Sequence, residues 1–185
     1  MTRYVCLLRA INVGGRNITM TELKKSFQKA GLEKVETFIA SGNVIFESAR
    51  KPRPLEKIIS TALQKDLGYA VPSFLRTLPE MQAVSGCKAF DDVTMSAATT
   101  YYIGFTTEAL TSDQKEKLFT FRSDVDEFNV VGREIYWACR TRSSDSKFNN
   151  AVMEKRLGIS ATWRGINTVR RLVAKYDDKP GSGKR

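Results

Sequence analysis

The segment LLRAINVGGRN, residues 7–17, brings a basic residue, an amide and a glycine pair together after an apolar run. Gly14 and Gly15 can adopt positive φ and turn their backbone N–H groups toward an anion. Arg9 can bind a phosphate or carboxylate through two parallel hydrogen bonds, and Asn12 lies close to it in the chain. The alternative is that the glycines only form a turn, with Arg9 on a solvated or interdomain face.

The spacing in this segment excludes the familiar nucleotide-binding loops. A Walker A loop needs G-x-x-x-x-G-K-[ST], whereas Gly14-Gly15-Arg16 lacks both the first glycine and the Lys-Ser or Lys-Thr pair. The dinucleotide pattern G-x-G-x-x-G is absent as well. Classical nucleotide hydrolysis is therefore not predicted.

A second polar group follows at SGN, residues 41–43. Ser41-Gly42 is suitable for a tight turn between two strands, and Asn43 can satisfy the backbone of that turn by itself. The functional alternative places Ser41 and Asn43 beside the loop at 12–16.

A third polar group lies in TWRGINTVRR, residues 162–171, where a helix is expected to begin. Asn167 or Thr168 can cap that helix and leave the arginines that follow in solvent. The alternative joins Arg164 and Asn167 to Arg9 and Asn12 in one anion-binding cleft between two halves, a favoured place for ligands. The predicted anion-binding residues are Arg9, Asn12, Gly14, Gly15, Ser41, Asn43, Arg164, Asn167 and Thr168.

The chain contains no histidine, which excludes Ser-His-Asp and Cys-His catalysis and His-ligated zinc. Its three cysteines, Cys6, Cys87 and Cys139, are odd in number and widely spaced, so neither a disulfide framework nor a zinc site is predicted. Cys6 and Cys139 are expected to be buried, reduced thiols in apolar strands. We predict no metal and no cofactor, and the sequence identifies no catalytic residue.

The formal net charge is +10, from 30 basic and 20 acidic residues. Such a charge attracts nucleic acid or phosphorylated ligands, although a solvated surface also explains much of it. Basic clusters at Arg50-Lys51-Arg53 and Arg140-Thr141-Arg142 could contact phosphates without reading sequence, and the RNA-recognition signature is absent. No apolar run is long enough for a membrane span, and Arg9 interrupts the N-terminal apolar run that a signal peptide would need. The default location is the cytoplasm, and the oligomeric state is not indicated.

Two βαββαβ units are predicted to position these residues. Periodicity and capping signals in the first half predict strands over 4–11, 35–40, 43–48 and 70–78, and helices over 20–31 and 54–68. The second half repeats this order from residue 99 and ends with a further helix. The predicted fold is α+β with two ferredoxin-like subdomains, antiparallel sheets and helices on one face. The predicted division is 1–80 and 99–176 for the halves, 81–98 for a connector and 177–185 for a disordered tail.

Three segments together resemble one family of bacterial proteins. They are LLRAINVGGRN (7–17), FIASGNVIF (38–46) and NNAVMEKRLGISATWRGINTV (149–169), which occur in the order seen in the domain-of-unknown-function 1697 family. The resemblance covers nearly the whole ordered chain and implies two ferredoxin-like subdomains, but no established activity. The chain departs from the family pattern at Ala10, where a glycine is usual. It departs again at Gly165-Ile166, which replaces an Asn-Trp pair and removes bulk from a possible site wall.

Three functions remain open from the sequence. The first is binding of a phosphate- or carboxylate-bearing small ligand in a cleft between the halves. The second is nonspecific nucleic-acid binding through the basic surface, and the third is a histidine-free enzyme acting on a phosphorylated or acyl substrate. Whether the protein is an enzyme is left open.

Overall fold

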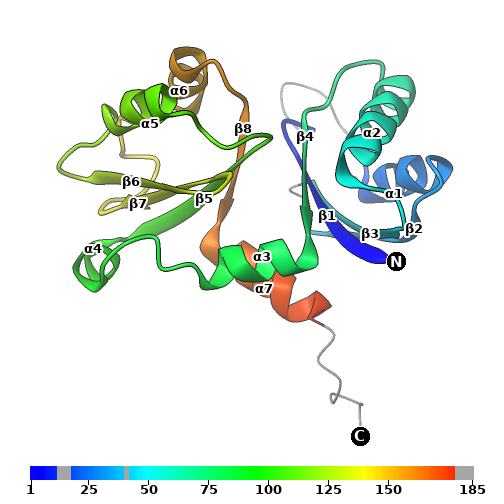
Figure 1. The fold of residues 1–185 in the computed structure, drawn as a ribbon, viewed down its shortest axis with the longest axis horizontal. Coiled ribbons are helices and arrows are strands. Elements are labelled where there is room, and N and C mark those ends of the chain that lie inside the picture. The colour runs from blue at the N-terminus through cyan, green and yellow to red at the C-terminus, as the bar shows by residue number, and fades with distance from the viewer. Residues whose placement is uncertain (12–17, 40–41, 178–185) are drawn as a thin grey trace, which may run out of the picture.

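Two successive βαββαβ units form the chain, which confirms the predicted α+β architecture (Figure 1). The computed structural model describes residues 1–11, 18–39 and 42–177. The first unit consists of β1 (Thr2–Leu8), α1 (Met20–Lys29), β2 (Glu33–Phe38), β3 (Asn43–Ser48), α2 (Pro52–Leu67) and β4 (Ser73–Thr77). The second consists of β5 (Thr100–Thr106), α5 (Ser112–Phe119), β6 (Asp126–Val131), β7 (Glu134–Cys139), α6 (Asn150–Leu157) and β8 (Ala161–Gly165).

The helices begin and end at residues whose chemistry favours those positions. Thr19 caps α1 in a capping box with Glu22, and Thr111 caps α5 in the same way. Gly158 follows α6 in the left-handed conformation, with φ of 67°, which a glycine adopts without strain. The same local signals were available in the sequence, and α1 and α2 begin and end within two residues of their predicted bounds.

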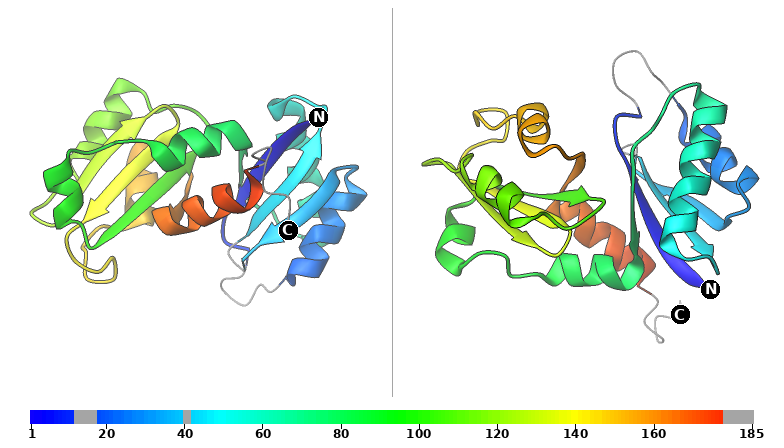
Figure 2. Two further views of the ribbon diagram at one scale, coloured as in Figure 1. Left: turned by 90° about the horizontal axis from the view of Figure 1, so that it is seen from below. Right: turned by 45° about the horizontal axis from the view of Figure 1, so that its top comes forward.

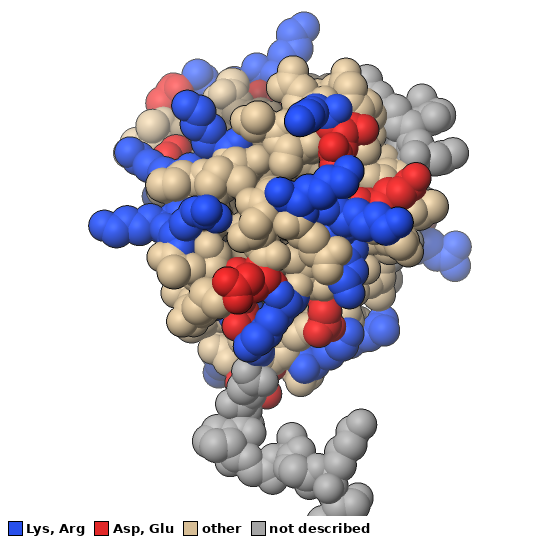
Figure 3. Space-filling view, turned by 90° about the vertical axis from the view of Figure 1, so that its right-hand side faces the viewer, with Lys and Arg blue, Asp and Glu red and all other residues tan. Residues whose placement is uncertain are grey.

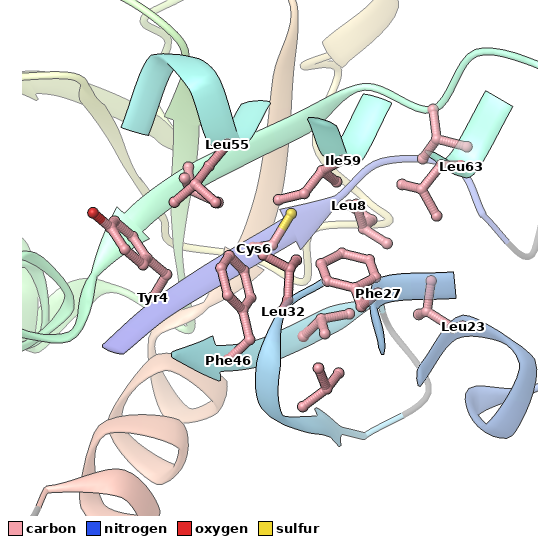
Figure 4. Close-up of a cluster of buried hydrophobic side chains, with 14 of the residues drawn as sticks. Tyr4, Cys6, Leu8, Leu23, Phe27, Leu32, Phe46, Leu55, Ile59 and Leu63 are labelled. Atoms are coloured by element: carbon pink, nitrogen blue, oxygen red, sulfur yellow. The ribbon is translucent and has the colours of Figure 1, made fainter. Parts of the chain in front are cut away.

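Each half contains a four-stranded antiparallel sheet. The strand order is β2-β3-β1-β4 in the first half and β6-β7-β5-β8 in the second. The helices of each unit cover one face of its sheet and lie on the outside of the molecule (Figure 1). In the first half, Cys6 and Leu8 of β1 pack in one cluster with Phe27 of α1 and Leu55 of α2 (Figure 4).

The opposite faces of the two sheets pack against each other. Val5 and Leu7 of β1 alternate with Cys6 and Leu8 and join a cluster that contains Phe105 and other residues of the second half. Both faces of β1 are therefore buried, which explains its continuous apolar run, since side chains alternate between the two faces of a strand.

Three further helices connect or brace the halves. They are α3 (Leu78–Gly86), α4 (Asp92–Ala97) and α7 (Ile166–Tyr176). The helices α3 and α7 lie side by side at the same end of both sheets (Figures 1 and 2). No helix in the described ranges has the length and hydropathy needed to cross a bilayer. Residues 178–185, which fall in the predicted disordered tail, lie outside the described part of the chain.

Candidate anion-binding site

Arg164 of β8 extends from the second half into the first. Its side chain is buried, with 8% of the residue exposed. The Nε atom donates to Asn43 Oδ1 at 2.7 Å, and Nη2 donates to the backbone oxygen of Leu8 at 2.9 Å. Nη1 donates to Thr162 Oγ1 and to the backbone oxygen of Trp163, each at 2.9 Å. These bonds hold the end of β1 and the start of β3 against β8.

Asn43 is the first residue of β3 and serves both halves at once. Its Nδ2 donates to the backbone oxygen of Phe38 at 3.0 Å, which is the turn bond that its side chain was predicted to make. The turn needs this support because Ile39 has φ of 52°, a conformation that is costly for a branched residue. Gly42 has φ of 73°, and a Cβ atom there would lie 2.8 Å from Ile11 Cδ1. Asn43 therefore stabilises the turn while its oxygen accepts from Arg164.

Arg9 lies next to Leu8, where the first strand has ended. Its guanidinium forms an ion pair with Glu154 of α6, and 30% of the arginine side chain is exposed. Glu154 Oε1 also accepts from the backbone N–H of Ala161 at 2.6 Å, which ties α6 to the start of β8. The structure thus brings Arg9, Asn43 and Arg164 together at the boundary of the halves.

Burial lowers the pKa of Arg164 to about 10, and the nearby Cys6 opposes this shift. The side chain therefore remains charged at pH 7. Its charge lies among hydrogen-bond acceptors supplied by both halves, and no buried side-chain N or O atom of the described residues lacks a partner. This part of the predicted site therefore acts as a buried polar connection between the halves.

Arg76 of β4 forms a second connection of the same kind, which sequence reasoning missed. Its side chain is 1% exposed, and its Nε donates to Glu134 Oε1 of β7 at 2.7 Å. Nη2 donates to the backbone oxygen of Thr106, the last residue of β5, at 2.8 Å. We call the Arg76–Glu134 pair the first lock and the Arg164–Asn43 pair the second lock. The signal that could have revealed the first lock is a lone arginine at the fourth residue of the last strand of each unit, the one charged residue in that strand.

Asn167 and Thr168 lie in a different place. They line a cavity of about 340 Å³ formed by the start of α7, the start of β5 and the end of α4. Tyr101 and Tyr102 form part of its wall, and the Tyr102 ring stacks on Trp137 at 5.5 Å between centroids. One alternative from the sequence places Asn167 in the same cleft as Arg164, but the strand ends at Gly165 and the helix leads away from the second lock.

The charge in this cavity is positive. Among the described residues that line it, Arg170 carries the one ionisable group with a full charge at pH 7. Burial raises the pKa of Tyr101 to about 12, with Cys87 adding to the shift and Arg170 opposing it, so its hydroxyl remains neutral at pH 7. The N-cap of α7 is Gly165, which supplies no side-chain cap, and the positive end of the helix dipole therefore faces the cavity.

Gly165 and Ile166 line the same cavity. These are the positions at which the sequence departs from the Asn-Trp pair expected from the family resemblance. A Cβ atom at Gly165 would lie 3.8 Å from Tyr102 Cε1, an ordinary contact distance. Larger side chains at these two positions would occupy space that is open in this chain.

The remaining predicted site residues, Asn12, Gly14, Gly15 and Ser41, lie outside the described residues. Within the described ranges, no group of three or more cysteine and carboxylate side chains could hold a metal ion.

Two ferredoxin-like halves packed through their sheets define the class of α+β protein to which the chain belongs. Within that class, it is a member of the family of proteins of unknown function DUF1697, whose model matches residues 1–136. Its fold is similar to that of the conserved bacterial protein SP0830 from Streptococcus pneumoniae. The TM-score is 0.76 at 25% identity, covering 96% of this chain and 99% of the other. A comparison with curated proteins found no match.

Proposed function

We propose that this protein binds a small molecule bearing a phosphate or carboxylate group, in the cavity at the start of α7. The observation that carries the proposal is the combination of Arg170 with Asn167 and Thr168 around that cavity. Arg170 would pair with the anionic group, while the two neighbouring side chains and the first-turn amides would donate or accept hydrogen bonds. The tyrosine walls suit a ligand with a flat or apolar body.

The locks at the boundary of the halves have a different part in this proposal. Arg164 and Asn43 position the two halves, and β8 leads directly into α7. Arg9 is partly exposed and remains the residue of that boundary best able to meet a ligand, although Glu154 already pairs with it. Binding at Arg9 is therefore the alternative place for the same ligand class.

The test measures binding of a panel of phosphates and carboxylates, including inorganic phosphate, citrate and adenosine monophosphate, by calorimetry. Arg170→Ala should weaken binding of any ligand found by about 10- to 100-fold, the usual effect of losing a charged hydrogen bond. Arg171→Ala is the matched control. It removes the same charge from the next residue of the helix, whose guanidinium lies over the Phe38 ring, 5.9 Å from its centroid, and not in the cavity.

Two further variants separate the alternatives. Ile166→Trp should abolish binding by filling the cavity while leaving Arg170 in place. Arg9→Ala should have no effect, and Arg3→Ala serves as its control because Arg3 is also a partly exposed arginine paired with a glutamate. If Arg9→Ala removes binding and Arg170→Ala does not, the ligand lies at the boundary of the halves and the cavity assignment is wrong.

Nucleic acid is the second candidate partner, favoured by the net charge of +10. We also propose that the protein is cytoplasmic. Cys6, Cys87 and Cys139 are all free thiols, as is usual in a reducing compartment. Subcellular fractionation would test the location.

A further inference from the structure

The outer layer of the first half, formed by α1, α2 and the two residues before α2, carries a concentrated positive charge. Residues 20–29 and 50–67 contain eight Lys and Arg residues and three acidic residues. All eight basic residues are exposed. The corresponding helices of the second half, 112–119 and 150–157, contain four basic and three acidic residues. Half of the net charge of the chain thus lies on one helical layer, over which Lys and Arg side chains are spread (Figure 3).

Two of the three acidic residues of this layer, Glu22 and Asp66, are engaged locally. Glu22 accepts from the backbone N–H and hydroxyl of Thr19, and Asp66 accepts from Ser26 Oγ at 2.6 Å. In contrast, Lys24, Lys25, Lys57 and Lys65 form no ion pair with any residue that the structure describes. Their charges are therefore available to a polyanion.

A groove lies within the same layer. It has a volume of about 450 Å³ between α1 and the C-terminal end of α2, and Lys25, Lys29 and Tyr69 are among its lining residues. Glu22 and Asp66 also line the groove, so its two lysines are balanced there, and the excess positive charge lies on the helix surfaces around it. Basic side chains around a groove that contains an aromatic ring are an arrangement used by proteins that bind single strands without reading sequence. Lysines contact the phosphates, and bases stack on the ring.

The other surface that a ferredoxin-like unit commonly offers to RNA is covered here. RNA-recognition domains of this topology bind RNA on the open face of the sheet. In this chain, the corresponding faces pack against each other through the cluster that contains Val5, Leu7 and Phe105. A nucleic acid would therefore have to bind elsewhere, and the helical layer is the strongly basic alternative.

We propose that the α1–α2 layer is a binding surface for single-stranded nucleic acid. The phosphates of the nucleic acid would lie along the lysines, and one base would stack on Tyr69. This inference is independent of the small-molecule cavity, which lies in the other half. Arg170→Ala should therefore leave it unchanged. Failure of either proposal would leave the other standing.

The test is fluorescence anisotropy with a labelled 20-nucleotide oligothymidylate between 50 and 300 mM NaCl. The variant Lys24→Gln/Lys25→Gln/Lys57→Gln/Lys65→Gln should bind at least about tenfold more weakly at 50 mM salt. The slope of log affinity against log salt concentration should become less steep by about three for this variant. Each of the four lost phosphate contacts contributes roughly 0.7 to that slope for a single strand. The control variant Lys88→Gln/Lys115→Gln/Lys117→Gln/Lys155→Gln removes the same charge from the connector and the second half and should change affinity by less than about twofold.

Tyr69→Ala tests the groove and should weaken binding by about fivefold or more, within the range measured for loss of base stacking. Circular dichroism must first show that the variants are folded. The proposal is overturned if the wild-type protein does not bind the oligonucleotide at 50 mM salt, or if both quadruple variants lose affinity equally. It is also overturned if vesicles containing phosphatidylserine bind through these lysines while the oligonucleotide does not.

Discussion

The two locks occupy equivalent positions of the two halves but use different chemistry. Each arginine is the fourth residue of the last strand of its unit, and each partner side chain is on the first residue of the third strand. Each Nη2 donates to the last residue of a first strand, and each Nη1 to the carbonyl of the residue before the arginine. The first lock ends on a carboxylate, Glu134, and the second on an amide, Asn43.

The difference follows from the second task of Asn43. An amide can accept from Arg164 through Oδ1 and donate to the Phe38 carbonyl through Nδ2. At neutral pH a carboxylate can accept hydrogen bonds but cannot donate one. An aspartate at position 43 would therefore leave the Phe38 carbonyl without its donor. Glu134 follows Gly132-Arg133, a turn in which glycine adopts positive φ, and its carboxylate can serve the arginine alone. Both units thus form the same kind of bond at the boundary of the halves. The acceptor side chain differs because the turn beside Asn43 also needs a donor.

The largest expected effect is that of Arg76→Met. The substitution leaves the carboxylate of Glu134 without its cation at a position that is 9% exposed. Removing one partner of a buried ion pair costs about 3–5 kcal/mol of unfolding free energy. Urea denaturation followed by tryptophan fluorescence measures the change.

The double variant Arg76→Met/Glu134→Met is the control for this first prediction. It removes both charges and should recover more than half of the lost stability, because paired apolar replacements are often neutral. If the double variant is as unstable as the single one, packing of the arginine stem explains the cost, and the charge comparison fails.

Arg164→Met should cost less, about 1–3 kcal/mol. It removes the bonds that two neutral groups, the Asn43 amide oxygen and the Leu8 carbonyl, accept from Arg164, and losing a bond to a neutral group costs less than leaving a buried charge unpaired. The same denaturation experiment measures it. A loss equal to that of Arg76→Met would show that the two locks do not differ in the way their chemistry implies.

Glu134→Gln gives the first lock an amide acceptor, as the second lock has. The glutamine oxygen can still accept from Arg76, but the attraction between opposite charges is lost. We expect a loss of about 1–2 kcal/mol, since charge-assisted bonds are roughly twice as strong as neutral ones. No loss of stability would mean that an amide serves equally well at both positions.

The sequence predicted the elements better than it predicted the interface between them. Thr19, Thr111 and Gly158 act within a few residues of their own position, so their effects are visible in a short window of sequence. The lock between Arg76 and Glu134 depends on two sheets packing face to face, across 58 residues of chain. The arginine in β4 marks a position that needs a partner, but the sequence does not say which residue of the other sheet supplies it.

The candidate site was predicted in part for the same reason. Asn43 was correctly expected to support its own turn, which is a local bond. The sequence did not predict the partner of Arg9. Glu154 is buried, with 8% of the residue exposed, but nothing in the sequence of its helix indicates that burial. Arg164 and Asn167 were placed in one cleft, but the change from strand to helix at Gly165 separates their environments. Sequence spacing did not predict the direction of the chain at that junction.

The smallest expected effect lies at the rim of the boundary, where ion pairs meet solvent. Lys34 and Arg3 hold the pKa of Glu47 below its ordinary value. A lowered carboxyl pKa gives stability that is present above the unfolded-state pKa of about 4.3 and is lost as the pH falls through the lower folded-state value. Glu47→Gln should therefore cost less than about 1 kcal/mol at pH 7, because Lys34 is exposed and the glutamine oxygen can still accept from Arg3, and the difference from wild type should vanish toward pH 3. Urea denaturation of both proteins at pH 7, 5 and 3 measures this. A cost at pH 7 approaching that of Arg76→Met would show that the rim contributes to stability as strongly as the locks.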